Sequence, residues 1–314
     1  MLENFILSLN IIFPMILLVV LGFYLKRIDF INRGFLISAN KLIFYAGIPS
    51  LLFINIYQSD IVEIFDLEFI LFISIINIIY FFVAWVITYF LLRKKAYNII
   101  GAFVQGTFRG NITILALPIL LNILGDYAAK GALVVAVLIP MYNILSVIML
   151  SIHSNKNVSV KAMIIGMAKN PPLLGTLFGI LVSLSGIRTP MFARSTLSML
   201  SQITTPIALI CLGAGMTFEG FSNRFKYALY SSFFKTIIMP AIIGVLAYIW
   251  GFYGIDMVIF VIMSGVPTSI TSYVMIVELG GDEYVASTNI VLTTVMSGVT
   301  MTFWIFILMT LGFL

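Results

Sequence analysis

The sequence predicts an all-α integral membrane protein whose ten helices form two inverted five-helix repeats. Three observations predict this class: the composition, the recurrence of long apolar runs, and a pattern that the two halves of the chain share. Of the 314 residues, 61% are hydrophobic and only 9% are charged, whereas soluble domains are roughly 45–50% apolar and about 25% charged. A soluble fold of this length has no way to bury so much apolar surface, so the solvent must be lipid.

Ten apolar segments are expected to cross the bilayer, whose hydrocarbon core requires about 20 apolar residues per helix. Unpaired backbone groups are costly in lipid, so each segment should be helical, and the short alternating strands of a β-barrel are missing from the sequence. The first segment has no preceding Lys or Arg and no cleavage site, which predicts a retained helix. The segments are 5–25, 36–57, 68–92, 98–124, 131–151, 171–186, 196–217, 227–250, 256–279 and 286–312.

Lysine and arginine are distributed unequally over the connecting loops. If the N-terminus is outside the cytoplasm, the outside loops hold only Lys130, Arg188 and Arg194. Cytoplasmic loops carry an excess of Lys and Arg, so both termini should lie outside the cytoplasm; the expected location is a bacterial inner membrane. The same asymmetry explains the net charge of +5 without a nucleic-acid partner. The inside loops hold Lys26, Arg27, Arg33, Arg93, Lys94, Lys95, Lys156, Lys161, Lys169, Arg224 and Lys226.

The two halves of the chain share an offset of 157 residues. A shift of one further residue aligns Asn111-Ile112-Thr113 with Ser269-Ile270-Thr271. This predicts a first repeat at 1–151, a cytoplasmic linker with an amphipathic segment at 152–170, and a second repeat at 171–314. Five helices per half place the second half upside down, as in many secondary transporters, whose sites lie near the bilayer midplane. The pairs at offset 157 are Pro14 with Pro171, Leu17 with Leu174, Gly22 with Gly179, and Pro49 with Pro206.

Two segments, 98–124 and 256–279, are interrupted by Gly, Pro and polar residues at corresponding places. Proline removes a backbone donor, glycine lets the chain unwind, and such a pair of broken helices is typical of a transporter's binding site. The alternative is that these residues only kink the helices for packing. The candidate substrate-binding residues are Arg109, Gly110, Asn111, Thr113, Pro118, Gly265, Pro267, Thr268, Ser269, Thr271, Ser272 and, in the segment 227–250, Lys235.

Arg109 is the most informative charge in these segments. It lies about 16 Å into its helix at 1.5 Å per residue, where a charge is costly and usually functional. Its positive charge predicts an anionic substrate, although an arginine that snorkels or binds backbone carbonyls remains the alternative. Lys235 is nearer a helix end. Because no acidic residue lies at mid-depth in any segment, the sequence argues against a cation exchanger.

Two motifs in the broken segments resemble the auxin efflux carrier family of plant PIN-formed carriers and their bacterial relatives. The run GNITILALPIL from Gly110 has the spacing of that family's GN…P motif, and the run 265–288 (GVPTSITSYVMIVELGGDEYVAST) is similar to its ninth helix. The resemblance covers essentially the whole chain. Ala116 and Ser272 stand where plant carriers tend to have glycine and proline, which argues against auxin itself as the substrate.

The resemblance implies a fold like that of sodium/proton antiporters and bile-acid symporters. The segments 5–25, 36–57, 171–186 and 196–217 would form a scaffold, and the other six a mobile transport domain. The breaks at 109–118 and 265–272 would cross, with Asn111 contacting a substrate carboxylate. The resemblance also implies a homodimer and malate-like or auxin-like carboxylates as substrates.

Four functions remain to be compared, and one of them, a passive channel, fits the repeat with its paired broken helices less well than alternating access does. The first is a carrier of small organic anions that works by alternating access. The second is a sodium- or proton-coupled symporter or exchanger for another small solute on the same fold. The third, a membrane enzyme, lacks support because the single histidine, His153, lies in a loop and no His, Asp, Glu and Cys cluster offers a metal or catalytic site. No cofactor is expected.

Overall fold

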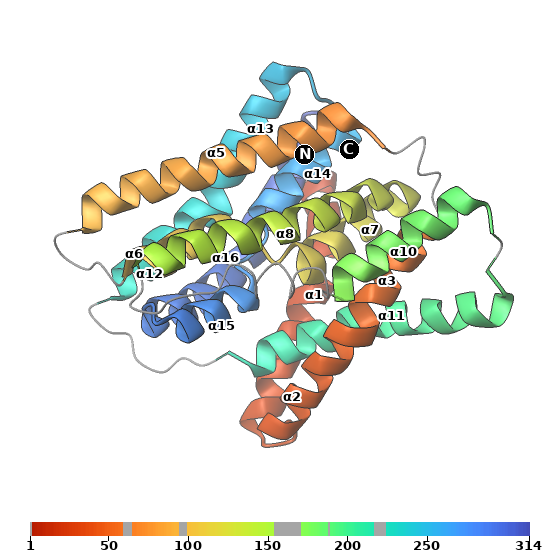
Figure 1. Ribbon diagram of the computed structural model, residues 1–314, viewed down its shortest axis with the longest axis horizontal. Helices are drawn as coiled ribbons and strands as arrows, with labels where there is room; N and C mark the ends of the chain where they lie inside the picture. Colours follow the sequence, from red (N-terminus) through yellow and green to blue (C-terminus); the bar gives the residue numbers. More distant parts are fainter. Residues whose placement is uncertain (1, 59–64, 94–98, 154–170, 188, 217–223) are drawn as a thin grey trace.

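The computed structural model describes residues 2–58, 65–93, 99–153, 171–187, 189–216 and 224–314. In these ranges all regular elements are helices, and the only β contact is an isolated antiparallel bridge between Gly110 and Thr268. The predicted amphipathic segment of the linker lies outside the described residues. Figure 1 shows long helices crossing one another, with the two chain ends close together.

Six helices run without a break. They are α1 (Leu2–Arg27), α5 (Leu67–Leu92), α8 (Ala128–His153), α10 (Pro171–Ser185), α11 (Met191–Ala214) and α16 (Glu283–Thr310). The others are interrupted: α2 (Arg33–Leu42), η1 (Ile43–Gly47) and α3 (Ile48–Tyr57); α6 (Ile99–Phe108), η2 (Ile112–Ala116), α7 (Leu117–Leu124) and η3 (Gly125–Tyr127); α12 (Phe225–Phe233), η4 (Phe234–Ile238) and α13 (Met239–Trp250); α14 (Ile255–Gly265) and α15 (Ile270–Leu279).

Within the described ranges, seven helical stretches are long and apolar enough to cross a membrane. They are Glu3–Arg27, Arg33–Tyr57, Leu67–Leu92, Ile112–His153, Met191–Ala214, Phe225–Trp250 and Glu283–Thr310. Ile99–Phe108, Pro171–Ser185 and Ile255–Gly265 are shorter apolar helices. The multi-pass membrane class predicted from composition is therefore confirmed, while ten crossings remain a prediction.

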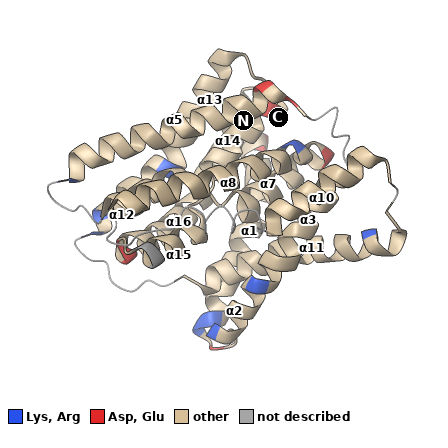
Figure 2. Cartoon of the chain, in the orientation of Figure 1, with Lys and Arg blue, Asp and Glu red and all other residues tan. Residues whose placement is uncertain are grey.

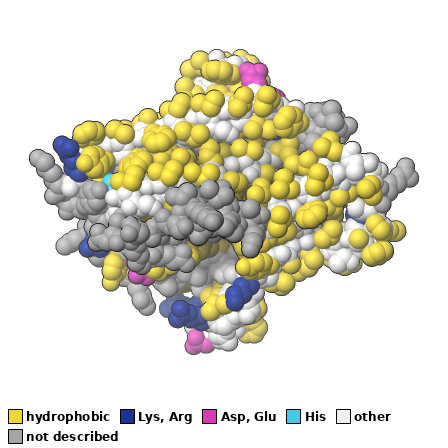
Figure 3. All heavy atoms as spheres, viewed as in Figure 1, with side chains coloured by type: hydrophobic (Ala, Val, Ile, Leu, Met, Phe, Trp, Pro, Cys, Tyr) yellow, Lys and Arg dark blue, Asp and Glu magenta, His cyan; other side chains and the backbone are white. Residues whose placement is uncertain are grey.

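The outside of the molecule is apolar, as a lipid environment requires. Met191 is 78% exposed and Val299 75% exposed. Hydrophobic side chains cover most of the face seen in Figure 3. In Figure 2, the basic and acidic residues lie mainly toward the ends of the helices.

Three helical turns are widened into five-residue π segments, η1, η2 and η4. Each is followed by a proline at the second residue after it: Pro49, Pro118 and Pro240. Proline cannot donate a backbone hydrogen bond, and its ring clashes with the preceding turn. A wider turn accommodates both effects, and such π segments occur often at functional sites.

The first packing group consists of α1, α2, α3, α10 and α11. In it α1 packs against α11, and α3 packs against α10 and α11. The backbones of α1 and α11 touch at glycines: a Cβ on Gly213 would lie 1.8 Å from the carbonyl oxygen of Val19, and one on Gly22 would lie 2.0 Å from that of Ile210. Small residues at such contacts let membrane helices approach closely.

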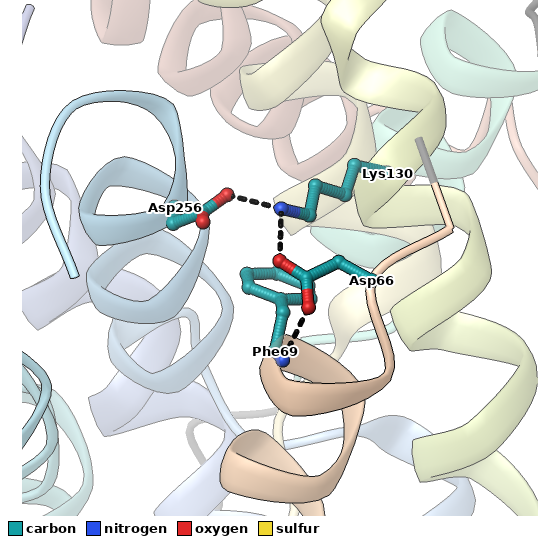
Figure 4. Close-up of polar contacts among 4 residues, drawn as sticks. All are labelled: Asp66, Phe69, Lys130 and Asp256. Carbon is teal, nitrogen blue, oxygen red and sulfur yellow. Dashed lines mark hydrogen bonds and ion pairs between the residues drawn. The ribbon is translucent and has the colours of Figure 1, made fainter. Parts of the chain in front are cut away.

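The second packing group consists of α5 to α8 and α12 to α16. Here α5 packs against α6, α13 against α14, and α16 against α6, α12, α14 and α15. Lys130 at the start of α8 joins two neighbouring helix ends, because its Nζ lies 2.6 Å from Asp256 Oδ1 of α14 and 3.3 Å from Asp66 Oδ2 (Figure 4). Asp66 also caps α5 by accepting a hydrogen bond from the Phe69 amide.

A second ion pair joins two other helices of this group. Arg224, the N-cap residue of α12, pairs with Asp282, the N-cap residue of α16. The side chain of Asp282 is fully buried and also accepts a hydrogen bond from the Val285 amide. Both ion-pair clusters therefore fix the positions of helix ends within the second packing group.

Candidate functional site

The two broken helices meet at their interruptions. The helix α6 ends at Phe108, and helical structure resumes only at Ile112 in η2. On the other chain segment α14 ends at Gly265, and α15 begins at Ile270. Val266 is extended, with φ −62° and ψ 153°, as expected of a residue that precedes a proline. The sequence pattern of Gly, Pro and polar residues thus locates both breaks.

The backbone groups released by the two breaks bind each other. The amide of Asn111 donates to the carbonyl of Pro267 at 2.7 Å, and the amide of Ser269 donates to the carbonyl of Arg109 at 3.0 Å. These two bonds flank the bridge between Gly110 and Thr268. Irregular backbone within a membrane is tolerated only where its polar groups are satisfied, so this short antiparallel pairing stabilises the crossing.

The carbonyl ends of α6 and α14 are also satisfied, but by different donors. Thr268 Oγ1 donates to the Gly106 carbonyl at 2.9 Å. The Nζ of Lys235 donates to the carbonyl of Ser264 and lies 3.5 Å from Met239 Sδ. A helix C-terminus carries partial negative charge, so the ammonium of Lys235, which is fully buried, compensates the end of α14.

Arg109 leaves the end of α6 and is buried, with 5% of its surface exposed. Its Nη2 donates to Asn143 Oδ1 at 2.6 Å and to Thr271 Oγ1 at 3.0 Å, while Nη1 donates to Ser146 Oγ at 3.2 Å. Among the described residues, no carboxylate forms an ion pair with Arg109. A buried cation that is held only by neutral groups attracts an anion, because burial of an uncompensated charge is costly.

Asn111 supplies a second polar group beside Arg109. Its side chain is 5% exposed, and its Nδ2 is buried without a hydrogen-bond partner among the described residues. Buried donors are normally paired. A ligand with an acceptor oxygen would therefore satisfy an amide that the protein itself leaves unpaired.

Both side chains line a cavity of about 330 Å³ where the two packing groups meet. The first group contributes Phe44, Ile48 and Pro172 to its wall. Apart from Arg109, no charged residue in the described part of the chain lines the cavity. The remaining lining consists of Gly110, Asn111, Ile112, Thr113, Ile114, Ile139, Tyr142, Asn143, Ser269, Ile270, Thr271, Val274 and Met275. A small apolar pocket with a few convergent polar groups is typical of a small-molecule site.

The residues proposed from sequence fall into two sets. Arg109, Gly110, Asn111, Thr113, Ser269 and Thr271 line this cavity together. The others do not. Lys235 and Thr268 donate to the carbonyls of Ser264 and Gly106, Pro267 lies on the opposite face of the crossing, and a Cβ on Gly265 would lie 3.1 Å from Met301 Sδ. Pro118 is the second residue of α7, and Ser272 is buried with its hydroxyl unpaired among the described residues.

Sequence reasoning missed the contribution of α8. Asn143 and Ser146 are nearly one helical turn apart and both bind the Arg109 guanidinium. Tyr142 lines the cavity and donates to Asn77 Oδ1 at 3.0 Å. The available signal was an asparagine in the middle of an apolar segment, where a polar side chain usually has a partner.

The chain was compared with known proteins. A family model described as membrane transport protein matches residues 8–305. An uncharacterized transporter of Methanocaldococcus jannaschii is 22% identical over 319 residues, which cover 96% of this chain and 99% of the relative. One from Methanothermobacter thermautotrophicus is 23% identical and covers 95% of this chain and 97% of the relative. The transporter YfdV of Escherichia coli is 25% identical over 72% of this chain and 74% of its own length.

The match spans both packing groups and the crossing between them. It agrees with the resemblance of the two interrupted segments, and the relatives are transporters by name. The chain therefore belongs to the membrane transport protein family, the auxin efflux carrier family that its motifs at Gly110 and Gly265 resemble.

Proposed function

We propose that this protein is a secondary transporter of small organic anions, carboxylates in particular. The observation that carries the proposal is the buried guanidinium of Arg109, which lines the cavity and has no carboxylate partner among the described residues. The unpaired Nδ2 of Asn111 adds a neutral donor. A carboxylate beside them would accept a hydrogen bond from Asn111 and neutralise the charge of Arg109, whose Nη atoms are oriented by Ser146, Met275, Asn143 and Thr271.

The lining favours one anionic group per substrate. Arg109 is the only cation among the described residues that line the cavity, and much of the remaining wall consists of isoleucine, valine and phenylalanine side chains. A second carboxylate would be desolvated against these walls without a partner, which is costly. We therefore expect auxin-like monocarboxylates with an apolar body to compete better than malate-like dicarboxylates.

Alternating access around this cavity is the proposed mechanism, with ten crossing helices in two inverted repeats. The crossing itself supports the repeats. Gly110 and Thr268 lie 158 residues apart, and the same offset relates Asn111 to Ser269 and Arg109 to Pro267. The offset therefore converts the bond from Asn111 to Pro267 into the bond from Ser269 to Arg109, with donor and acceptor exchanged between the two halves. A two-fold axis through the crossing would produce this relationship.

In this proposal the two packing groups are the two domains that move relative to each other. The first, with α1, α3, α10 and α11, would be the scaffold, and the second, with the crossing, the transport domain that moves as an elevator. The cavity reaches Pro172 at the start of α10, next to the linker that the distribution of Lys and Arg assigns to the cytoplasm. In this conformation the site would face the cytoplasm of a bacterial cell, with the termini outside, and a homodimer would form through the scaffold.

Transport by the reconstituted full-length protein tests the proposal. Liposomes would be assayed for uptake of radiolabelled aromatic monocarboxylates and of dicarboxylates, with wild type, Arg109→Ala and Asn111→Ala. We expect uptake by the wild type, a large loss in both variants, and competition by unlabelled carboxylates but not by cations. Uptake at the wild-type rate in both variants would mean that the substrate binds elsewhere.

The second candidate, a sodium- or proton-coupled carrier of another solute, is tested in the same vesicles. Collapse of uptake when the sodium or proton gradient is removed would favour it. The uncompensated charge of Arg109 favours the uncoupled carrier, since an anion alone neutralises this site.

A further inference from the structure

A second cavity lies on the other side of the crossing, between the first and second packing groups. Its volume is about 660 Å³, twice that of the cavity at Arg109. One wall is α1 from Phe5 to Phe23, and the opposite wall is α16 from Thr294 to Phe306, with Pro267 of the crossing between them. We call this space the outer crevice.

The described residues of the outer crevice offer no free polar side chain to a ligand. None of those that line it is charged, and their three hydroxyls already donate to carbonyls of their own helix. Thr294 Oγ1 donates to Ile290 at 2.7 Å, Ser297 Oγ to Thr294 at 2.8 Å, and Thr302 Oγ1 to Gly298 at 2.8 Å. A polar ligand would lose its hydration here without gaining partners, so the occupant must be apolar.

A comparison with the Arg109 cavity also indicates an apolar occupant. The offset of 158 residues that joins Gly110 to Thr268 relates Arg109 to Pro267 and Asn143 to Met301, and both of these line the outer crevice. Arg109 and Asn143 supply a guanidinium and a carboxamide to the Arg109 cavity. Their counterparts supply only apolar side chains to the outer crevice. The outer crevice is therefore not a second anion site.

The mouth of the outer crevice opens at the depth of the lipid tails. Phe13 and Val299 line it and are 52% and 75% exposed. Phe13 is about 16 Å from the start of α1 and Val299 about 24 Å from the start of α16, at 1.5 Å per residue. Both lie well inside helices that are long enough to span the roughly 30 Å hydrocarbon core. Hydrocarbon chains are thus the molecules that contact this opening.

We propose that the outer crevice binds one acyl chain of a membrane phospholipid between α1 and α16. An empty space of this size would forfeit the dispersion contacts of the side chains around it, and a flexible methylene chain restores them without needing a hydrogen bond. The proposal requires only the membrane location of the chain. Its consequence for transport, that the acyl chain lies between scaffold and transport domain beside the direct contact of α1 with α16, rests on the proposed function.

Photolabelling in vesicles tests this binding. The full-length protein would be reconstituted in phosphatidylcholine and phosphatidylglycerol vesicles that contain a phosphatidylcholine with a mid-chain diazirine. After irradiation, labelled peptides would be identified by mass spectrometry. We expect the label to concentrate on α1 and α16 relative to the exposed face of α5, none of whose described residues lines the outer crevice.

A pair of variants separates the outer crevice from general lipid contact. Val295→Trp places a large side chain at the mouth, where Val295 is 59% exposed. Ile79→Trp adds the same side chain at a 50% exposed position of α5, away from the crevice. Val295→Trp should lose most of the label on α1 and α16, whereas Ile79→Trp should keep it. Because both positions face lipid, neither change should prevent folding.

Three outcomes would overturn the proposal. Equal labelling of α5 and of the α1 and α16 peptides would indicate general lipid contact only. Label that persists unchanged in Val295→Trp would place the bound chain elsewhere. Cross-links between two copies through these helices, with a change of oligomeric state in Val295→Trp, would identify a second protein chain as the occupant. None of these readouts depends on transport, so failure here leaves the proposed function standing.

Discussion

The main-chain amide of Asn111 donates a 2.7 Å hydrogen bond to the carbonyl of Pro267, which comes from the opposite broken helix. The reciprocal bond from Ser269 to Arg109 closes the pair. Each break therefore fixes the backbone of the other, and the side chains of Arg109 and Asn111 leave the crossing in defined directions. A binding site built on this backbone should be sensitive to small changes in its side chains.

Replacing Arg109 by lysine should lower carboxylate uptake although the positive charge is kept. Arginine presents a planar fork that binds Asn143, Thr271 and Ser146 together, whereas lysine is a flexible point charge. Loss of one charge-assisted bond is worth about 1.5–3 kcal/mol, and about 1.4 kcal/mol is tenfold in affinity. Initial uptake rates below saturation should fall about tenfold or more. A rate for Arg109→Lys equal to wild type would show that charge alone matters.

Thr268→Val should destabilise the crossing. Thr268 Oγ1 satisfies the Gly106 carbonyl at the end of α6, and valine has the same shape but no donor. A buried polar group left unpaired costs about 1–3 kcal/mol, so we expect a lower midpoint of thermal unfolding in detergent. Thr302→Val is the matched control, because Thr302 is equally buried but donates only within its own helix. Equal midpoints for the two variants would contradict the role given to Thr268.

The sequence predicted the positions of the breaks but not every side chain that surrounds them. Gly, Pro and polar residues mark an interruption by their own backbone chemistry, so α6, α14 and Arg109 could be found without a structure. The face that a membrane helix turns inward is harder to find, because α8 is apolar around its whole circumference. For this reason Asn143 was missed, and Lys235, which was predicted to bind the substrate, donates instead to the Ser264 carbonyl.

The contact between α1 and α11 should not tolerate a methyl group at Gly213. A Cβ there would lie 1.8 Å from the carbonyl oxygen of Val19, and a backbone atom cannot move aside as a side chain can. Overpacking typically costs about 1–3 kcal/mol, so Gly213→Ala should lower the unfolding midpoint and the yield of folded protein.

Gly244→Ala is the control for this change. Its Cβ would meet only Val261 Cγ2 at 3.1 Å, and alanine favours helix over glycine by about 0.8–1 kcal/mol. We expect a midpoint at or slightly above wild type. A similar loss in both variants would mean that helix packing at Gly213 is looser than the α1–α11 contact indicates.

The stability of the protein should depend on pH through Asp66. Burial raises the pKa of Asp66, but the hydrogen bond from the Phe69 amide and the charge of Lys130 outweigh it and hold the pKa below its usual value. A carboxyl whose pKa is lower in the folded state adds stability above its unfolded pKa, about 3.9. That stability disappears as the pH falls through the folded pKa. The unfolding midpoint should therefore decrease between neutral pH and pH 3.

Asp66→Asn separates this contribution from those of other acids. The variant keeps an N-cap acceptor for Phe69 but loses the charge that faces Lys130 (Figure 4). At neutral pH it should unfold at a lower temperature than wild type, and the difference should shrink as the pH falls below about 4 and the wild-type carboxyl takes up a proton. Asp126→Asn, at a site with no ion pair among the described residues, should follow the wild-type profile. A constant difference between Asp66→Asn and wild type at all pH values would show that the amide disturbs packing. An effect of the charge must disappear when the wild-type carboxylate takes up a proton.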